Sequence, residues 1–235
     1  MSAPDGRRYA GADPEERRLR RRADLLSAGL ELFGSEGFAN VSVKRLCDHA
    51  GLTQRYFYES FADRQAILAA VYENCVADAR SRTVDAVAQY LHDGENDGDG
   101  AVAAADIPAA AHAALDAFIG ALAGDPRRAR IILVEVVGVN PDIERLRLSA
   151  IHGWADLILT LALGRQIPDR AQRLAAIGLV GAVTQLLVDW YTTSTGQFGI
   201  IGEESADLFE LEAIVTTSVE LFIAAHGRLL VKRSP

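Results

Sequence analysis

Apolar residues recur three or four positions apart along most of the chain, which is the periodicity of amphipathic helices. The first such segment extends from about residue 15 to residue 35, and its apolar set is Ala23, Leu26, Leu30 and Phe33. A longer one begins at Asp63 and continues to about Tyr90. No segment shows a convincing strand alternation. The pattern therefore predicts an all-α protein with about nine helices.

Two short helices are expected between these segments. Ser42 is suited to cap the start of a helix whose buried face holds Val43, Leu46 and Cys47. Gly51 then supplies a sharp turn, because glycine reaches positive φ without strain. Thr53 is placed to cap a third helix of about seven residues. Phe57 and Phe61 lie four positions apart, so both are expected to point back to the core.

Proline and Asx signals delimit the remaining helices. We predict helices from Pro108 to Gly124, from Asp125-Pro126 to Val137, from Asn140-Pro141 to Gly164, from Pro168 to about Thr195, and from Glu203 to Ala225. Residues 1–14 are rich in Gly, Pro, Ala and charge, and are expected to form a disordered arm. The predicted organisation is this arm, a three-helix domain over residues 15–62, and a larger helical domain over residues 63–235.

Composition favours a cytoplasmic protein. The 235 residues contain two cysteines, Cys47 and Cys75, both at apolar-periodic positions, so buried thiols are expected rather than a disulfide. The Arg-rich start lacks the apolar segment of a signal peptide. The most apolar run, residues 174–188, is shorter than a membrane span and contains two polar residues, so no membrane helix is expected.

Charge is distributed unevenly. The net charge is −8, yet residues 1–60 hold ten Lys and Arg against nine Asp and Glu, a net of +1. Residues 7–22 alone carry seven Arg and three acidic residues. The arginines at 17, 18 and 20–22 can form a solvated helix start. Beside two short helices joined by a glycine turn, contact with DNA phosphates is the better interpretation.

The N-terminal third resembles the TetR family of bacterial one-component transcriptional regulators. The resemblance covers residues 25–68 and rests on four elements that occur in register. They are Gly29-Leu30-Glu31-Leu32-Phe33-Gly34-Ser35-Glu36-Gly37-Phe38, Ser42-Val43, Ala50-Gly51-Leu52-Thr53, and Tyr58-Glu59-Ser60-Phe61-Ala62-Asp63-Arg64. The resemblance implies a helix-turn-helix whose third helix enters the major groove of a near-palindromic operator. The chain departs from the family pattern at Leu46-Cys47, where Ile-Ala is usual.

Several residues are candidates for DNA contact. Gln54 and Arg55 head the third helix and belong to the types that pair bidentately with adenine and guanine edges. Ser42 and Thr53 stand at helix starts, where hydroxyl and N–H groups can hold phosphate. Lys44 and Arg45 are expected to act through general electrostatics, and Arg64 keeps the phosphate-binding charge of the lysine common in the family. Tyr56 can reach a base or sugar, or pack on the surface. Tyr58 can reach phosphate, or belong to the core.

The larger domain matches the family in helix count, length and order, which implies a homodimer with a small-molecule effector. Apolar residues cover more than one face of the last two helices, and a dimer interface is expected at Gly178, Gly181 and Ala182. A largely apolar ligand is expected near Phe118, Trp154 and Gln185. No cofactor and no metal site is predicted: a calcium-like stretch from Asp93 to Asp99 has Ala104 where the loop needs its last carboxylate.

Two other functions remain open from the sequence. The chain can be a DNA-binding helical protein controlled by a protein partner, for which the acidic stretch over residues 93–99 is the support. It can also be an all-helical enzyme that uses His112, His152 or Glu135, although no catalytic spacing supports it. The favoured hypothesis is a DNA-binding regulator of the repressor type, released by a small ligand.

Overall fold

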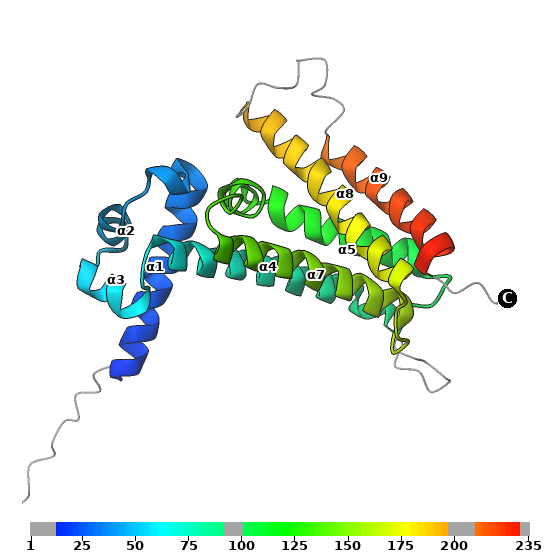
Figure 1. The fold of residues 1–235 in the computed structure, drawn as a ribbon, viewed down its shortest axis with the longest axis horizontal. Coiled ribbons are helices and arrows are strands. Elements are labelled where there is room, and N and C mark those ends of the chain that lie inside the picture. The colour runs from blue at the N-terminus through cyan, green and yellow to red at the C-terminus, as the bar shows by residue number, and fades with distance from the viewer. Residues whose placement is uncertain (1–12, 92–100, 197–209, 231–235) are drawn as a thin grey trace, which may run out of the picture.

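The computed structural model describes residues 13–91, 101–196 and 210–230. Within these ranges the chain forms nine α-helices with short 3-10 and π-helical turns and no strand, so the predicted all-α class is confirmed. The first three helices lie at one end of the molecule, and α4 leads from them into the larger helical body (Figure 1). The predicted disordered arm and the acidic stretch over 93–99 lie outside the described residues, apart from Asp13 and Pro14.

The N-terminal helices follow their sequence signals closely. They are α1 (Pro14–Glu36), α2 (Val43–Ala50) and α3 (Gln54–Ser60). The Ser42 hydroxyl accepts a hydrogen bond from the Arg45 N–H, as a capping residue should. Gly51 has a φ of +66°, the left-handed conformation that the turn between α2 and α3 requires. Thr53 stands at the N-cap position of α3, but its side chain makes no capping hydrogen bond, which corrects that expectation.

The core of these helices extends into α4 (Arg64–Val87). Phe33, Phe57 and Leu46 are fully buried in one cluster with Ile67 and Leu68 of α4. The same cluster contains Ile131, Val136 and Ile143 from the larger domain. The predicted boundary at residues 62–63 therefore marks a change of helix, whereas the hydrophobic core continues across it.

The body is built from five further helices. They are α5 (Ile107–Ala123), α6 (Pro126–Arg130), α7 (Pro141–Leu163), α8 (Arg170–Thr195) and α9 (Leu211–Ala225), with a π-helical turn η3 (Ile131–Glu135) after α6. Asp169 caps α8 through a capping box with Gln172, so this helix begins two residues after the predicted Pro168. The predicted start of the last helix at Glu203 is wrong, because Glu210 is still extended; residues 203–209 lie outside the described chain.

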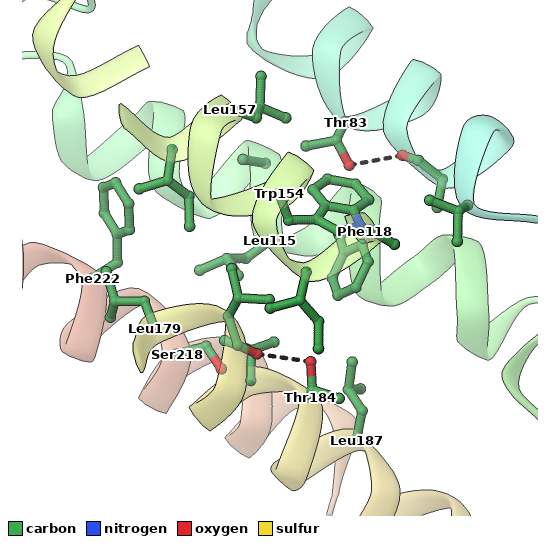
Figure 2. Close-up of a pocket in the computed structure, with 18 of the residues that line it drawn as sticks. Thr83, Leu115, Phe118, Trp154, Leu157, Leu179, Thr184, Leu187, Ser218 and Phe222 are labelled. Carbon is green, nitrogen blue, oxygen red and sulfur yellow. Dashed lines mark hydrogen bonds between the residues drawn. The ribbon is translucent and has the colours of Figure 1, made fainter. Parts of the chain in front are cut away.

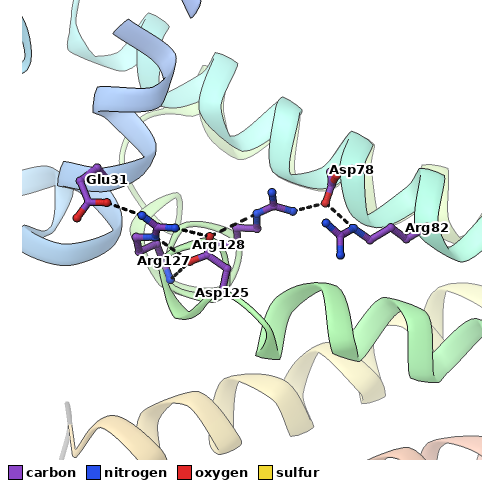
Figure 3. Close-up of polar contacts among 6 residues, drawn as sticks. All are labelled: Glu31, Asp78, Arg82, Asp125, Arg127 and Arg128. Carbon is purple, nitrogen blue, oxygen red and sulfur yellow. Dashed lines mark hydrogen bonds and ion pairs between the residues drawn. The ribbon is translucent and has the colours of Figure 1, made fainter. Parts of the chain in front are cut away.

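A network of ion pairs joins the two parts of the molecule (Figure 3). The Arg127 guanidinium pairs with Glu31 of α1 and with Asp125. Arg128 pairs with Asp78 of α4, which also meets Arg82. These contacts tie α6 to both α1 and α4.

A second set of contacts joins η3 to the end of α1. The Arg130 guanidinium donates to the Ser35 carbonyl at 2.8 Å and to Glu135 at 2.7 Å. Glu135 in turn accepts the Phe38 backbone N–H at 2.7 Å. The segment 125–135 is therefore the polar joint between the N-terminal helices and the body.

The close approach of α1 to α6 generates a test. A Cβ at position 34 would lie 2.7 Å from the Cα of Arg127, so Gly34→Ala must push the two helices apart. We expect the free energy of unfolding to fall by about 1–3 kcal/mol, the usual cost of overpacking. The control is Gly120→Ala on α5, where an added Cβ meets nothing within 4 Å. There we expect stabilisation of up to about 1 kcal/mol from helix propensity. Chemical denaturation measures both, and equal stability of the two variants would contradict the close contact.

Candidate DNA-binding surface and interior cavity

The start of α3 is open to solvent. Gln54 and Arg55 are both exposed, and the Arg55 side chain keeps 85% of its surface in solvent. The Arg55 Nε lies 3.2 Å from Glu59, one turn later on the same helix. Exposed pairs of this kind are weak, so Arg55 remains available for another acceptor.

The two tyrosines of α3 differ in their surroundings. Tyr56 is half-buried, and the Arg21 guanidinium of α1 lies 4.4 Å from its ring centre. Of the two predicted alternatives for Tyr56, contact with DNA or packing on the protein surface, this structure shows the packing. Tyr58 is 59% exposed and meets Phe57 edge-on at 5.3 Å, so it is not a core residue. Its hydroxyl is free to reach a phosphate.

The predicted residues of α2 are exposed and partly neutralised by neighbours. Lys44 pairs with Asp48 at 2.6 Å, and Arg45 pairs with Glu36 at 2.7 Å. A shallow groove brings Ser42 together with Tyr58 and Arg64, three candidates that belong to different helices. The tertiary structure thus assembles part of the predicted set on one surface.

Arg64 has a structural role that the sequence did not reveal. Its Nη1 donates to the Val41 carbonyl at 2.5 Å and to the Phe38 carbonyl at 3.1 Å. The guanidinium also lies 4.7 Å from the Phe38 ring centre. Arg22 is used similarly, because it donates to the Ser60 carbonyl at 3.0 Å. Both arginines hold backbone turns in place, so their description as phosphate contacts alone was incomplete.

The body encloses an apolar cavity of about 570 Å³. Its walls come from α4, α5, α7, α8, α9 and η3. Phe118 and Trp154 lie inside it and meet edge-on with ring centres 4.7 Å apart (Figure 2). Gln185 borders the cavity but is exposed and donates to Asp189 at 2.9 Å, so it stands at the rim rather than inside. The structure therefore brings all three predicted residues to one cavity.

The lining residues extend along much of α4. Tyr72 and Val87 both line the cavity, and fifteen residues of helix span about 22 Å.

The N-terminal helices decide the family. Residues 25–71 match the family profile of the bacterial regulatory proteins of the tetR family. These residues form a DNA-binding domain of the TetR type. The chain is accordingly a DNA-binding transcriptional regulator of the helix-turn-helix type, and the family of that domain consists of regulators and not of enzymes. The expectation of a regulator is confirmed, and the enzyme alternative is set aside.

Solved TetR-like structures share the fold along nearly the whole chain. FadR from Bacillus halodurans, a fatty acid degradation regulator, has a TM-score of 0.61 at 15% identity, covering 91% of this chain and 96% of its own. FadR from Bacillus subtilis in complex with stearoyl-CoA has a TM-score of 0.61 at 14% identity, covering 86% and 97%. A TetR-family regulator from Streptomyces coelicolor has 0.59 at 15%, covering 94% and 98%. None of the curated proteins matches by sequence.

Three helices of the body are apolar beyond what the single chain buries. By length and composition α7, α8 and the segment Leu211–Leu230 are each long and apolar enough to cross a membrane, which the apolar run over residues 174–188 did not indicate. Only 17–22% of their most apolar windows is buried. In this family the apolar helices form the ligand-binding domain, which matches their place around the cavity.

The exposure of Arg55 generates a second test. Arg55→Ala should weaken binding to the operator, recovered by genomic pull-down, by about 1–3 kcal/mol and relax base preference at one position of each half-site. The matched control is Arg18→Ala, since Arg18 is exposed on α1 and pairs with Glu15 at 2.6 Å. That change should affect operator and random DNA alike. Fluorescence anisotropy with both DNAs measures this, and unchanged operator specificity in Arg55→Ala rules out base reading by this residue.

Proposed function

We propose that this TetR-family regulator is a cytoplasmic homodimeric repressor that leaves a near-palindromic operator when a largely apolar ligand fills its cavity. The observation that carries the proposal is that the walls of the cavity and the packing of the DNA-binding helices share the same elements. Tyr72 lines the cavity and belongs to the N-terminal core. Ile132 lines the cavity from η3. Close to it in the chain, Arg130 holds Ser35 at the end of α1, and Glu135 holds the Phe38 backbone just after that helix.

Within this proposal, ligand acts by favouring one arrangement of α4 and η3. A ligand shifts such an equilibrium only by its differential affinity for the two states. Coupling energies of this kind are typically about 1–3 kcal/mol. A rigid core and an ion-paired joint transmit the shift, because neither deforms gradually.

The lining of the cavity supports a long-chain acyl compound as the ligand class. It is mainly aliphatic and aromatic, and it extends about 22 Å along α4, a length that accommodates an extended chain. The FadR structure from Bacillus subtilis was solved in complex with stearoyl-CoA, a ligand of this shape. At 14% identity that likeness concerns the fold, so the cavity of this chain is the main support.

The exposed faces of α8 and α9 support a homodimer. Leu174, Gly178 and Gly181 are all exposed along α8, and Leu221 is exposed on α9. An added Cβ at Gly178 or Gly181 meets nothing within 4 Å in the single chain, so a second helix has room to approach closely there. Two copies are also what a palindromic operator requires, since each presents one short recognition helix to one half-site.

Dimerisation generates a third test. Gly178→Asp places a charge on the exposed small-residue face of α8 and should convert the dimer to a monomer with weakened operator binding. Gly120→Asp is the control, because Gly120 is exposed on α5 and equally open. Analytical ultracentrifugation at micromolar concentration measures both variants. A monomeric unmodified protein would overturn the dimer, and a dimeric Gly178→Asp would move the interface elsewhere.

Ligand control generates a fourth test, which uses reciprocity. If hexadecanoyl-CoA lowers operator affinity by some factor, operator DNA must lower hexadecanoyl-CoA affinity by the same factor. Calorimetric titrations with and without a saturating operator duplex compare the two. Equal ligand affinity in both titrations rules out allosteric release, even with the cavity occupied. Operator binding that responds only to a protein partner would favour the partner-controlled alternative.

A further inference from the structure

One charged side chain lines the cavity, and it is a cation. Among the lining residues in the described parts of the chain, Arg147 of α7 is the only Asp, Glu, Lys, Arg or His. The other polar members are Tyr72, Thr83, Thr184, Gln185, Thr192 and Ser218. A cationic group in a mainly apolar wall offers a charge partner that a purely hydrophobic ligand leaves unused.

The guanidinium of Arg147 is only partly occupied. Its Nε and Nη2 donate to the Glu144 carboxylate at 3.1 and 2.5 Å, one turn earlier on α7. Its Nη1 has no partner among the described residues. Arginine offers five N–H donors in a fixed fork, so capacity for a second anion remains. The side chain is 27% exposed, which places it at the border between cavity and solvent.

Tyr72 of α4 lines the cavity near Arg147. It is buried on α4 and has no hydrogen-bond partner among the described residues. Burial raises the pKa of Tyr72 to about 12, so its hydroxyl stays neutral and can donate. A neutral donor and a cation in the same wall favour an anion over a cation or a neutral apolar group.

Arg147 lies toward one end of the cavity. Helices α4 and α7 run side by side in the same direction (Figure 1), with Leu146 packed against the cluster of Ile67 and Val71, and with Arg80 donating to the Gly153 carbonyl at 2.8 Å. Arg147 is therefore near Tyr72, at the end on the side of the DNA-binding helices. Val87, Val102 and Leu161 line the other end, where no charged side chain lies among the described residues.

We propose that the effector is an anionic single-chain amphiphile whose head group binds Arg147 while its chain extends toward Val87 and Val102. This rests on the proposed function, in which the cavity holds the effector. The head group supplies carboxylate or phosphate oxygens to the free Nη1 and to the Tyr72 hydroxyl. A free fatty acid and an acyl thioester of a phosphorylated carrier share this chemistry.

The position of the head group bears on control. Glu144 and the buried Ile143 are neighbours in the first turn of α7, and Ile143 belongs to the core shared with the N-terminal helices. A second anion at the free Nη1 brings a negative charge close to the Glu144 carboxylate, and repulsion between the two charges weakens the Glu144–Arg147 ion pair. Binding therefore loosens the ion pair in the first turn of α7, next to the core shared with the DNA-binding helices.

The test compares charged and neutral probes of equal chain length. Hexadecanoate, hexadecanoyl-CoA and 1-hexadecanol are titrated below their aggregation limits into the dimeric protein. The readout is Trp154 fluorescence in a Trp190→Phe background, because Trp154 lies in the cavity wall and these are the only two tryptophans. We expect at least one anionic probe to bind roughly ten-fold tighter than the alcohol, as befits a charge-assisted hydrogen bond.

Variants assign that preference to one side chain. Arg147→Gln should abolish the preference and leave the affinity for 1-hexadecanol within about two-fold, and Arg147→Lys should restore part of it. The matched control is Arg145→Gln, since Arg145 is exposed on the same helix and pairs with Asp142 at the same spacing. Arg145→Gln should keep the full preference. Comparing hexadecanoate with hexadecanoyl-CoA shows whether carboxylate or phosphate supplies the charge.

The failures can be told apart. Equal binding of charged and neutral probes, failure of both anionic probes to bind, or an unchanged preference in Arg147→Gln overturns the assignment of the head group. Release of operator DNA by each probe is measured separately. If 1-hexadecanol alone binds and releases DNA, the proposed function stands and the anionic class is wrong. If the anions bind at Arg147 without releasing DNA, the head-group site stands and ligand-controlled repression is wrong.

Discussion

The architecture depends on one hydrophobic cluster that does not stop at the edge of the DNA-binding helices. Phe33 and Phe57 are buried against Ile67 and Leu68 of α4, and Val136 from beyond η3 completes the same cluster. Protein interiors are packed closely, so a shift of α4 must be accommodated by the helices that it contacts. The two functional parts of the molecule are therefore mechanically one body. This arrangement supports the proposed control of DNA binding from the cavity.

The ion pairs and hydrogen bonds of the polar joint fix how the packed helices are oriented relative to one another. Arg127 and Arg128 connect α6 to α1 and α4, while Glu135 holds the Phe38 backbone. Several of these groups are partly exposed, so each pair contributes little stability by itself. Their value lies in geometry, because fixed hydrogen-bond partners select one relative placement of packed helices from several of similar energy.

The body contains an apolar cavity that the small side chains in its walls leave open. Ala79, Ala110 and Ala111 are buried in its walls, where larger side chains would have filled the space. Unfilled apolar volume costs stability because the lining atoms lose their contacts. A ligand that fills the cavity restores those contacts, and this gain contributes favourably to the free energy of binding. The single cation in the wall adds chemical selectivity to that general driving force.

The sequence by itself determined the all-α class, most of the helices and caps, and the TetR-type DNA-binding domain. Hydrophobic spacing, Ser42, Gly51 and the Asn140-Pro141 pair are local signals, and local signals are read within a few residues of where they act. It also identified Phe118 and Trp154 as cavity candidates, from bulky residues among many small ones. It could not show that the hydrophobic core continues across residues 62–63, since Ile143 joins the N-terminal core from far away in the chain.

Only the tertiary structure decided the roles of several arginines. Arg64, Arg22 and Arg147 look alike in sequence, yet two hold backbone carbonyls and the third faces a cavity. Their environments are made by segments far apart in the chain, and charge patterning carries no record of such partners. The start of the last helix was likewise misplaced, because apolar periodicity shows which face a helix buries more reliably than where the helix begins.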